Sequence, residues 1–155
     1  MTTNTAKYLT YTEAWRRIKN ATAGGFYFEV VTICESIISD RIFSYVKGVN
    51  PASKANIKTP FERLISEWRT LAQGNLPQHG TSDLGQAVNS WRIERNAVVH
   101  GLAKSLPGEP TLPVITFLTR AQNAAVEGAA LARSVSNWHK KQLTTHHRKQ
   151  VASKS

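Results

Sequence analysis

The side chains best suited to chemistry lie in one short stretch of the sequence, Trp91–Gly101. It contains Arg95, Asn96 and His100. In a helix, Asn96 and His100 share one face because they are four residues apart, and Arg95 lies beside them. An arginine stays protonated and holds phosphate oxygens, whereas a histidine gains and loses a proton near neutral pH. Together they supply the minimum needed to act on a phosphodiester without a metal ion.

Other catalytic motifs are missing from the sequence. There is no glycine-rich loop before a phosphate-binding lysine, no Gly-x-Ser-x-Gly turn and no His-x-x-x-His pair. The adjacent His146 and His147 lack a third ligand, so we expect no metal site and no cofactor. Arg133 and His139 form a second Arg-to-His pair, with five residues between them instead of four, but Arg133 is followed by serine. We interpret this second pair as a chance match.

Each residue of the motif also has a purely structural interpretation. His100 could stabilise the end of its helix through the helix dipole. Arg95 could pair with a buried carboxylate, for which Glu35 in an apolar stretch is the candidate. Glu35 would then orient the arginine, so the two interpretations are compatible. Asn96 could do no more than satisfy buried backbone groups.

Charge favours an acidic partner. The 155 residues carry 20 Lys and Arg against 10 Asp and Glu, a net charge of +10. No carboxylate side chain follows Glu127, whereas six cations do: Arg133, Lys140, Lys141, Arg148, Lys149 and Lys154. Such a field attracts nucleic-acid phosphates, and the attraction weakens with salt. Arg92 and Lys104 flank the motif and are candidates for RNA contact; a solvated basic surface is the alternative.

Helices are expected to position these residues. Apolar periodicity, glycines and prolines predict five, at residues 12–24, 26–47, 61–72, about 82–104 and about 113–142. Thr59 and Glu62 predict a capping box before the third helix, and residues 81–83 offer caps for the fourth. In the fourth helix Arg95 occupies a position where the apolar pattern calls for a hydrophobic side chain. The seam of the last helix begins at Val114 and includes small residues, which allow a neighbouring helix to approach closely.

Composition limits the class of protein. The length suits one domain. The most apolar stretch, residues 26–46, contains four charged side chains, so we expect neither a membrane span nor a membrane partner. We find no signal-sequence pattern at the N-terminus, and the single cysteine, Cys34, excludes an internal disulfide. A cytoplasmic protein is expected.

The sequence resembles the HEPN domains, compact helical domains whose ribonuclease members carry an arginine, four to six residues, then a histidine. The residue after the arginine is commonly asparagine, as in Arg95-Asn96-Ala97-Val98-Val99-His100. The order of helices also agrees over residues 10–142. The resemblance implies an all-α, compact HEPN-like bundle of about five helices over residues 8–142. Residues 143–155 are expected to form a disordered basic tail.

The resemblance further implies a homodimer in which two copies of the motif face each other. Catalytic members are metal-independent endoribonucleases, often toxins or antiphage effectors of abortive-infection or toxin–antitoxin systems. We therefore expect Arg95, Asn96 and His100 to be catalytic toward RNA, with a cognate antitoxin protein or an inhibitory RNA as a further partner. The alternative is a non-catalytic helical module that binds a nucleic acid or a partner protein.

Overall fold

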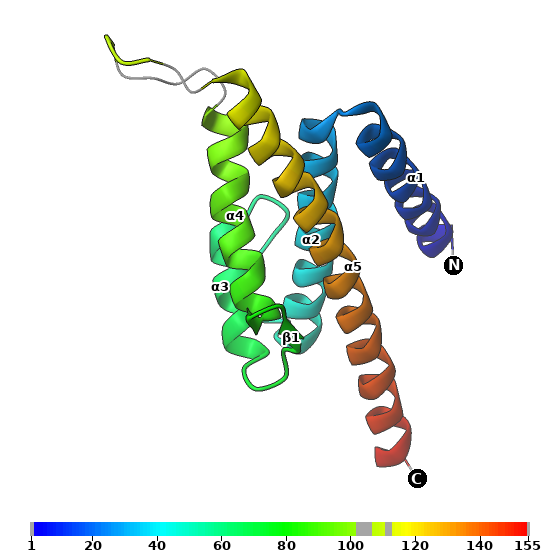
Figure 1. Ribbon diagram of the computed structural model, residues 1–155. Coiled ribbons are helices and arrows are strands. Elements are labelled where there is room, and N and C mark those ends of the chain that lie inside the picture. The colour runs from blue at the N-terminus through cyan, green and yellow to red at the C-terminus, as the bar shows by residue number, and fades with distance from the viewer. Residues whose placement is uncertain (1, 102–106, 111–112, 155) are drawn as a thin grey trace. The chain divides into compact units, whose positions relative to one another are not determined.

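The computed structural model describes residues 2–101, 107–110 and 113–154. Within them the chain forms five helices and one short hairpin (Figure 1). The helices are α1 (Thr2–Gly24), α2 (Tyr27–Val49), α3 (Phe61–Leu71), α4 (Leu84–Gly101) and α5 (Val114–Ser153). The expected all-α fold is therefore confirmed. None of the described helices is long and apolar enough to cross a membrane.

The contacts divide the chain into two units. The first unit consists of Met1–Ile37 and Ser90–Ala130, and the second consists of Ile38–Asn89 and Leu131–Ser155. Helices α2, α4 and α5 contribute residues to both units. The motif belongs to the first unit, and the basic C-terminal segment belongs to the second.

Aromatic contacts organise the core of the first unit. Phe28 of α2 stacks on Phe117 of α5, with ring centroids 5.6 Å apart. Trp91 of α4 is buried and donates its indole N–H to the backbone carbonyl of Ala124 at 2.8 Å. The same ring packs on Gly128, where an added Cβ would lie 2.7 Å from it. Small residues of α5 thus admit the indole, as the sequence pattern predicts for a close helix contact.

Helix α1 begins ten residues earlier than the expected start at Thr12. Its polar first half contains no glycine or proline, and Thr10 and Thr12 donate hydroxyl hydrogen bonds to carbonyls one turn earlier, at 2.9 and 3.0 Å. The local sequence therefore offers nothing to stop the helix, although it lacks the apolar periodicity that would have predicted one.

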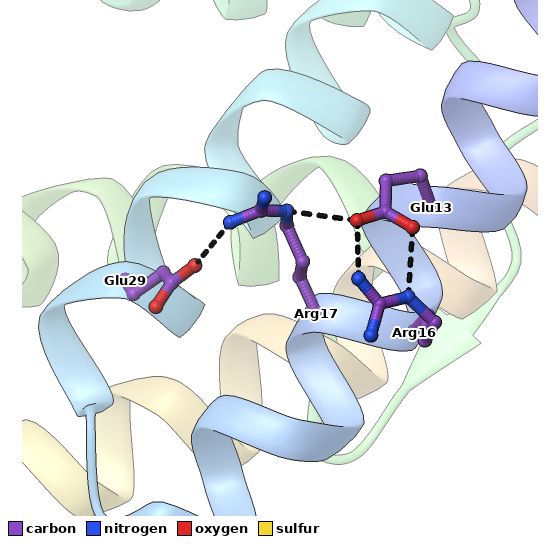
Figure 2. A network of polar contacts seen from close by, with 4 residues as sticks. All are labelled: Glu13, Arg16, Arg17 and Glu29. Carbon is purple, nitrogen blue, oxygen red and sulfur yellow. Dashed lines mark hydrogen bonds and ion pairs between the residues drawn. The ribbon is translucent and has the colours of Figure 1, made fainter.

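A network of charges joins α1 to α2 (Figure 2). Glu13 accepts hydrogen bonds from Arg16 and Arg17, at 2.5 Å from Arg16 Nη2 and 3.0 Å from Arg17 Nε. Arg17 also reaches Glu29 at the start of α2, at 3.3 Å. Between the helices, Gly25 adopts a φ of 74°, which a glycine accepts without steric cost.

The second unit is centred on Trp68 of α3 and Trp138 of α5. Both indoles are buried, and their ring centroids lie 5.7 Å apart in an edge-on contact. Tyr45 of α2 also packs on Trp138, with ring centroids 4.6 Å apart. The indole N–H of Trp138 donates to the carbonyl of Asn75 at 2.9 Å, so the loop after α3 is tied to α5. The sequence pattern predicts only helices, with no strand.

A small antiparallel hairpin precedes α4. Strands β1 (Gln78–His79) and β2 (Ser82–Asp83) pair Gln78 with Asp83 around a turn in which Gly80 has a φ of 63°. Asp83 then caps α4, because its Oδ1 accepts the backbone N–H of Gln86 at 2.9 Å. This cap was among those expected. Two-residue strands carry too little alternation to be predicted from sequence.

The capping box expected at α3 is wrong. Pro60 is the N-cap residue and makes no side-chain capping bond. The hydroxyl oxygen of Thr59 instead accepts the backbone N–H of Asn56 at 2.8 Å, inside the preceding turn. The seam expected along α5 also fails at its first position, because Val114 is 73% exposed there.

The expectation of a disordered tail at residues 143–155 is corrected, because α5 continues to Ser153. Every side chain from residue 143 to 154 is exposed, so tertiary packing does not cause this helix. The segment contains neither glycine nor proline, so nothing in its sequence ends the helix before Ser153. Its lysines and arginines are not four residues apart, which avoids like-charge contacts along the helix.

Candidate functional site

Helix α4 places the motif through a row of buried apolar side chains. Leu84, Val88, Trp91 and Val98 are all buried. Arg95 occupies the gap in this row and is half-buried. At this position α4 carries a cation instead of an apolar residue, and the side chain that it faces on α2 is the carboxylate of Glu35.

Arg95 is held by two neighbours in the first unit. Its Nε forms an ion pair with Glu35 Oε2 on α2, and each of the two side chains is 20% exposed. Its Nη1 donates a hydrogen bond to Asn96 Oδ1 at 2.7 Å. An arginine has five N–H donors, so these two contacts leave the guanidinium able to bind an anion as well. The structure thus brings Arg95, Asn96 and Glu35 together.

Burial, Arg95 and His100 all shift the pKa of the Glu35 carboxyl. Burial raises the pKa of its carboxyl, while the charge and hydrogen bond of Arg95 act in the opposite direction. The charge of His100 also lowers this pKa, which means that the imidazole lies within electrostatic reach of Glu35. Arg95 and His100 therefore both act on the same carboxylate.

His100 is exposed and lies one residue before the end of α4. Asn96, one turn earlier on the same face, is half-buried. The imidazole can therefore meet a ligand in solvent, while the side chains that surround Arg95 are held more tightly. This arrangement pairs a fixed cation with an accessible group that can transfer a proton.

The flanking cations differ in what the structure shows. Arg92 is half-buried and lies one turn before Arg95. Lys104 lies outside the described residues. A cation that the sequence pattern did not single out is Arg120 of α5, which reaches Glu94 of α4 at 3.1 Å. No local pattern could have revealed it, because the two residues are 26 positions apart.

The second Arg-to-His pair does not form a comparable site. Arg133 is exposed, whereas His139 is 5% exposed. A separation of six residues turns them toward different sides of α5. His146 and His147 are both exposed. Among residues 2–101, 107–110 and 113–154, no three His, Cys, Asp or Glu side chains gather in a way that could hold a metal ion.

Comparison with known proteins gives one partial similarity. No family model and no solved structure matches the chain. A tRNA-2-methylthio-N(6)-dimethylallyladenosine synthase from Novosphingobium aromaticivorans is 30% identical over 103 residues. The matched stretch covers 64% of this chain and 21% of that protein. The chain therefore spans about a fifth of the length of the curated relative that it resembles.

Proposed function

We propose that this protein is a metal-independent endoribonuclease that acts as a homodimer and resembles the HEPN ribonucleases. The observation that carries the proposal is the group around Arg95. The guanidinium is fixed by Glu35 and Asn96, and the exposed His100 lies within electrostatic reach of the same carboxylate. A fixed cation beside an accessible imidazole suits a phosphodiester whose charge rises during cleavage.

In the proposed reaction, an RNA 2′-hydroxyl attacks the adjacent phosphorus. His100 removes the 2′ proton, the bond from phosphorus to the 5′ oxygen breaks, and an imidazolium protonates that oxygen. In the dimer, the second copy of His100 supplies this acid. The products are a 2′,3′-cyclic phosphate and a 5′-hydroxyl. General acid–base catalysis of this kind contributes about 10²- to 10⁴-fold.

Arg95 binds the non-bridging oxygens through the donors that its two protein contacts leave over, and Asn96 keeps the guanidinium in place. The net charge of +10 favours RNA over acidic proteins of lower charge density. The curated relative is named for a reaction on tRNA, which makes tRNA the first substrate to try. We place the enzyme among toxins or antiphage effectors, with a cognate antitoxin protein or RNA as its inhibitor.

The test is incubation of purified protein with tRNA and total RNA in EDTA, followed by mapping of the new ends. We expect cyclic-phosphate ends with wild type and at least about a 10²-fold slower rate with His100→Ala or Arg95→Ala. His147→Ala and Arg63→Ala are matched controls, since both residues are exposed and outside the motif. Full activity in His100→Ala, or cleavage only with added metal, would overturn the proposal.

A mixing experiment tests the composite site. Arg95→Ala and His100→Ala protomers are each expected to be inactive alone. A mixed dimer holds a single wild-type His100, so a site that uses both copies of His100, as proposed above, leaves the mixture inactive. Recovery of part of the activity would mean that one arginine and one histidine from different protomers suffice, and that the second His100 is not the acid.

One observation favours a second candidate, a non-catalytic module that binds RNA or a protein. Arg95 already has a carboxylate partner within its own chain, as a purely structural arginine would. This candidate predicts RNA binding that weakens with salt and gives no new ends. The mapping experiment separates the two functions, because RNA bound by wild type would then remain uncut.

A further inference from the structure

The C-terminal part of α5 carries a row of cations on one face, which we call the basic ridge. It consists of Arg133, Lys140, Lys141 and Arg148, all exposed. At about 100° of rotation per residue, the four side chains fall within about a third of the helix circumference. They extend along about 22 Å of helix axis. All four belong to the second unit and none is part of the proposed catalytic site.

The opposite face of the same helix is buried. Leu131, Val135 and Trp138 are each no more than 5% exposed and form part of the core of the second unit. The ridge therefore points away from this core, because its residues lie about half a turn from the buried ones. Helix formation in the segment beyond residue 142 is what aligns Arg148 with the earlier cations; a disordered tail would not do so.

The helix segment that carries the ridge contributes no acidic side chain, because none follows Glu127 in the sequence. The hydroxyls of Thr144 and Thr145 donate to the carbonyls of Lys140 and Lys141, at 3.1 and 3.0 Å, so these threonines turn back toward the helix. The ridge can thus recognise charge along a line, but it offers few directional groups for reading bases.

We propose that the basic ridge is a docking surface for the phosphate backbone of double-stranded RNA regions. The identification of the nucleic acid as RNA rests on the proposed function. The inference that the ridge binds a phosphate backbone rests on the arrangement of its four cations. Trp138, the one Phe, Tyr or Trp after Phe117, is buried, so the segment offers no exposed Phe, Tyr or Trp ring on which single-stranded bases could stack. A duplex presents phosphates at high density along a line, which matches a straight row of cations.

An anionic membrane is the competing partner, and the ridge fits it less well. Helices that lie on membranes have a broad apolar face opposite their cations. Beyond residue 142, the apolar side chains are Leu143, Val151 and Ala152. Leu143 and Val151 are exposed but eight residues apart, and together with Ala152 they form no broad apolar face. The phosphate backbone of RNA is therefore the partner that the charge pattern favours.

The test measures binding of a 2′-O-methylated RNA duplex by fluorescence anisotropy between about 50 and 200 mM salt. The methyl groups remove the attacking hydroxyl, so binding is measured whether or not the protein cleaves RNA. The ridge variant changes all four cations to Gln. The control variant changes Lys19, Lys54, Lys58 and Arg63 to Gln, which removes the same charge from exposed residues elsewhere.

We expect the slope of log K against log salt, which is negative, to become shallower by about 3 to 4 in the ridge variant. Each phosphate that the protein no longer neutralises accounts for about 0.9 of the slope. The control variant should keep most of the wild-type slope. If the salt dependence weakens equally in the ridge and control variants, binding depends only on net charge, and the proposal is overturned. Unchanged RNA binding with loss of binding to phosphatidylserine vesicles would assign the ridge to a membrane instead. Circular dichroism shows whether each variant retains its helices.

Discussion

Arg95 of α4 forms an ion pair with Glu35 of α2, and each side chain is only 20% exposed. The position of Arg95 interrupts the apolar row of its helix, so the pair replaces a hydrophobic contact between α4 and α2. An ion pair that is largely removed from water costs desolvation on both sides. His100 also acts electrostatically on Glu35, so the ion pair and the imidazole belong to one cluster.

The first prediction concerns the cost of breaking this pair. Glu35→Leu or Arg95→Met should each lower the free energy of unfolding by about 3 kcal/mol, because the remaining charge is left without its partner. The double variant Glu35→Leu/Arg95→Met should lose less unfolding free energy than the two single variants lose together. Urea denaturation of the four proteins measures the coupling. Strictly additive decreases would show that the pair does not interact energetically.

The second prediction concerns the pKa of Glu35. Burial raises it above the ordinary value of 4.5, so the folded state holds the proton to higher pH than the unfolded chain does. The contribution of Glu35 to stability therefore falls as pH rises from 4.5 through the raised pKa. Carboxyl ¹³C NMR should give a pKa above 4.5 in wild type, and a higher one in Arg95→Met. A pKa at or below 4.5 would contradict the dominance of burial.

The third prediction concerns the contact between Gly128 and Trp91. A Cβ at position 128 would lie 2.7 Å from the indole ring, which is itself buried and hydrogen-bonded. Gly128→Ala should therefore destabilise the protein by about 1 to 3 kcal/mol despite its better helix propensity. Gly48→Ala is the matched control, because a Cβ at that helical position meets nothing within 4 Å. We expect this control to stabilise the fold by about 0.5 to 1 kcal/mol in thermal or urea unfolding.

The helices around the core could be predicted because their apolar periodicity is strong. Residues 26–47 predict α2 (Tyr27–Val49) to within two residues at its end. Prediction failed where a helix forms without an apolar face that packs on the core. The polar first half of α1 and the exposed end of α5 lack an apolar face, so nothing in their pattern separates them from a solvated coil.

The fourth prediction follows from the end of α5. Deletion of residues 143–155 should reduce the helical far-UV circular dichroism signal roughly in proportion to the fraction of the protein's helical residues that the deletion removes. The midpoint of thermal unfolding should change little, because side chains 143–154 are exposed and contribute no core contacts. Substitution of Gln150 by Pro in the full chain is the matched variant, since it breaks the helix without removing charge. An unchanged dichroism signal after deletion would mean that this segment is not helical in solution.

At the candidate site, the sequence predicts which residues share a face of α4 but leaves open what opposes them. Spacing alone places Asn96 and His100 one turn apart. The partner of Arg95 is 60 positions away in the chain, so the pairing with Glu35 depends on how α2 packs on α4. The ion pair of Arg120 with Glu94 could not be predicted for the same reason, because the sequence around a charged surface residue does not indicate its partner.

The fifth prediction concerns Glu13 and acid. Hydrogen bonding by Arg16 is the main reason why the pKa of Glu13 falls to about 2, and Arg17 adds to the shift. Because the pKa is lower in the folded state, Glu13 stabilises the fold above pH 4.5, and this contribution is lost as pH falls toward 2. Glu13→Gln should therefore be less stable than wild type near neutral pH, and the difference should disappear in acid. Glu109→Gln, which removes a carboxylate from an exposed turn outside this network, should not reproduce the pattern. A difference that stays constant between pH 7 and pH 2 would show that the Glu13 carboxylate is not held by the two arginines.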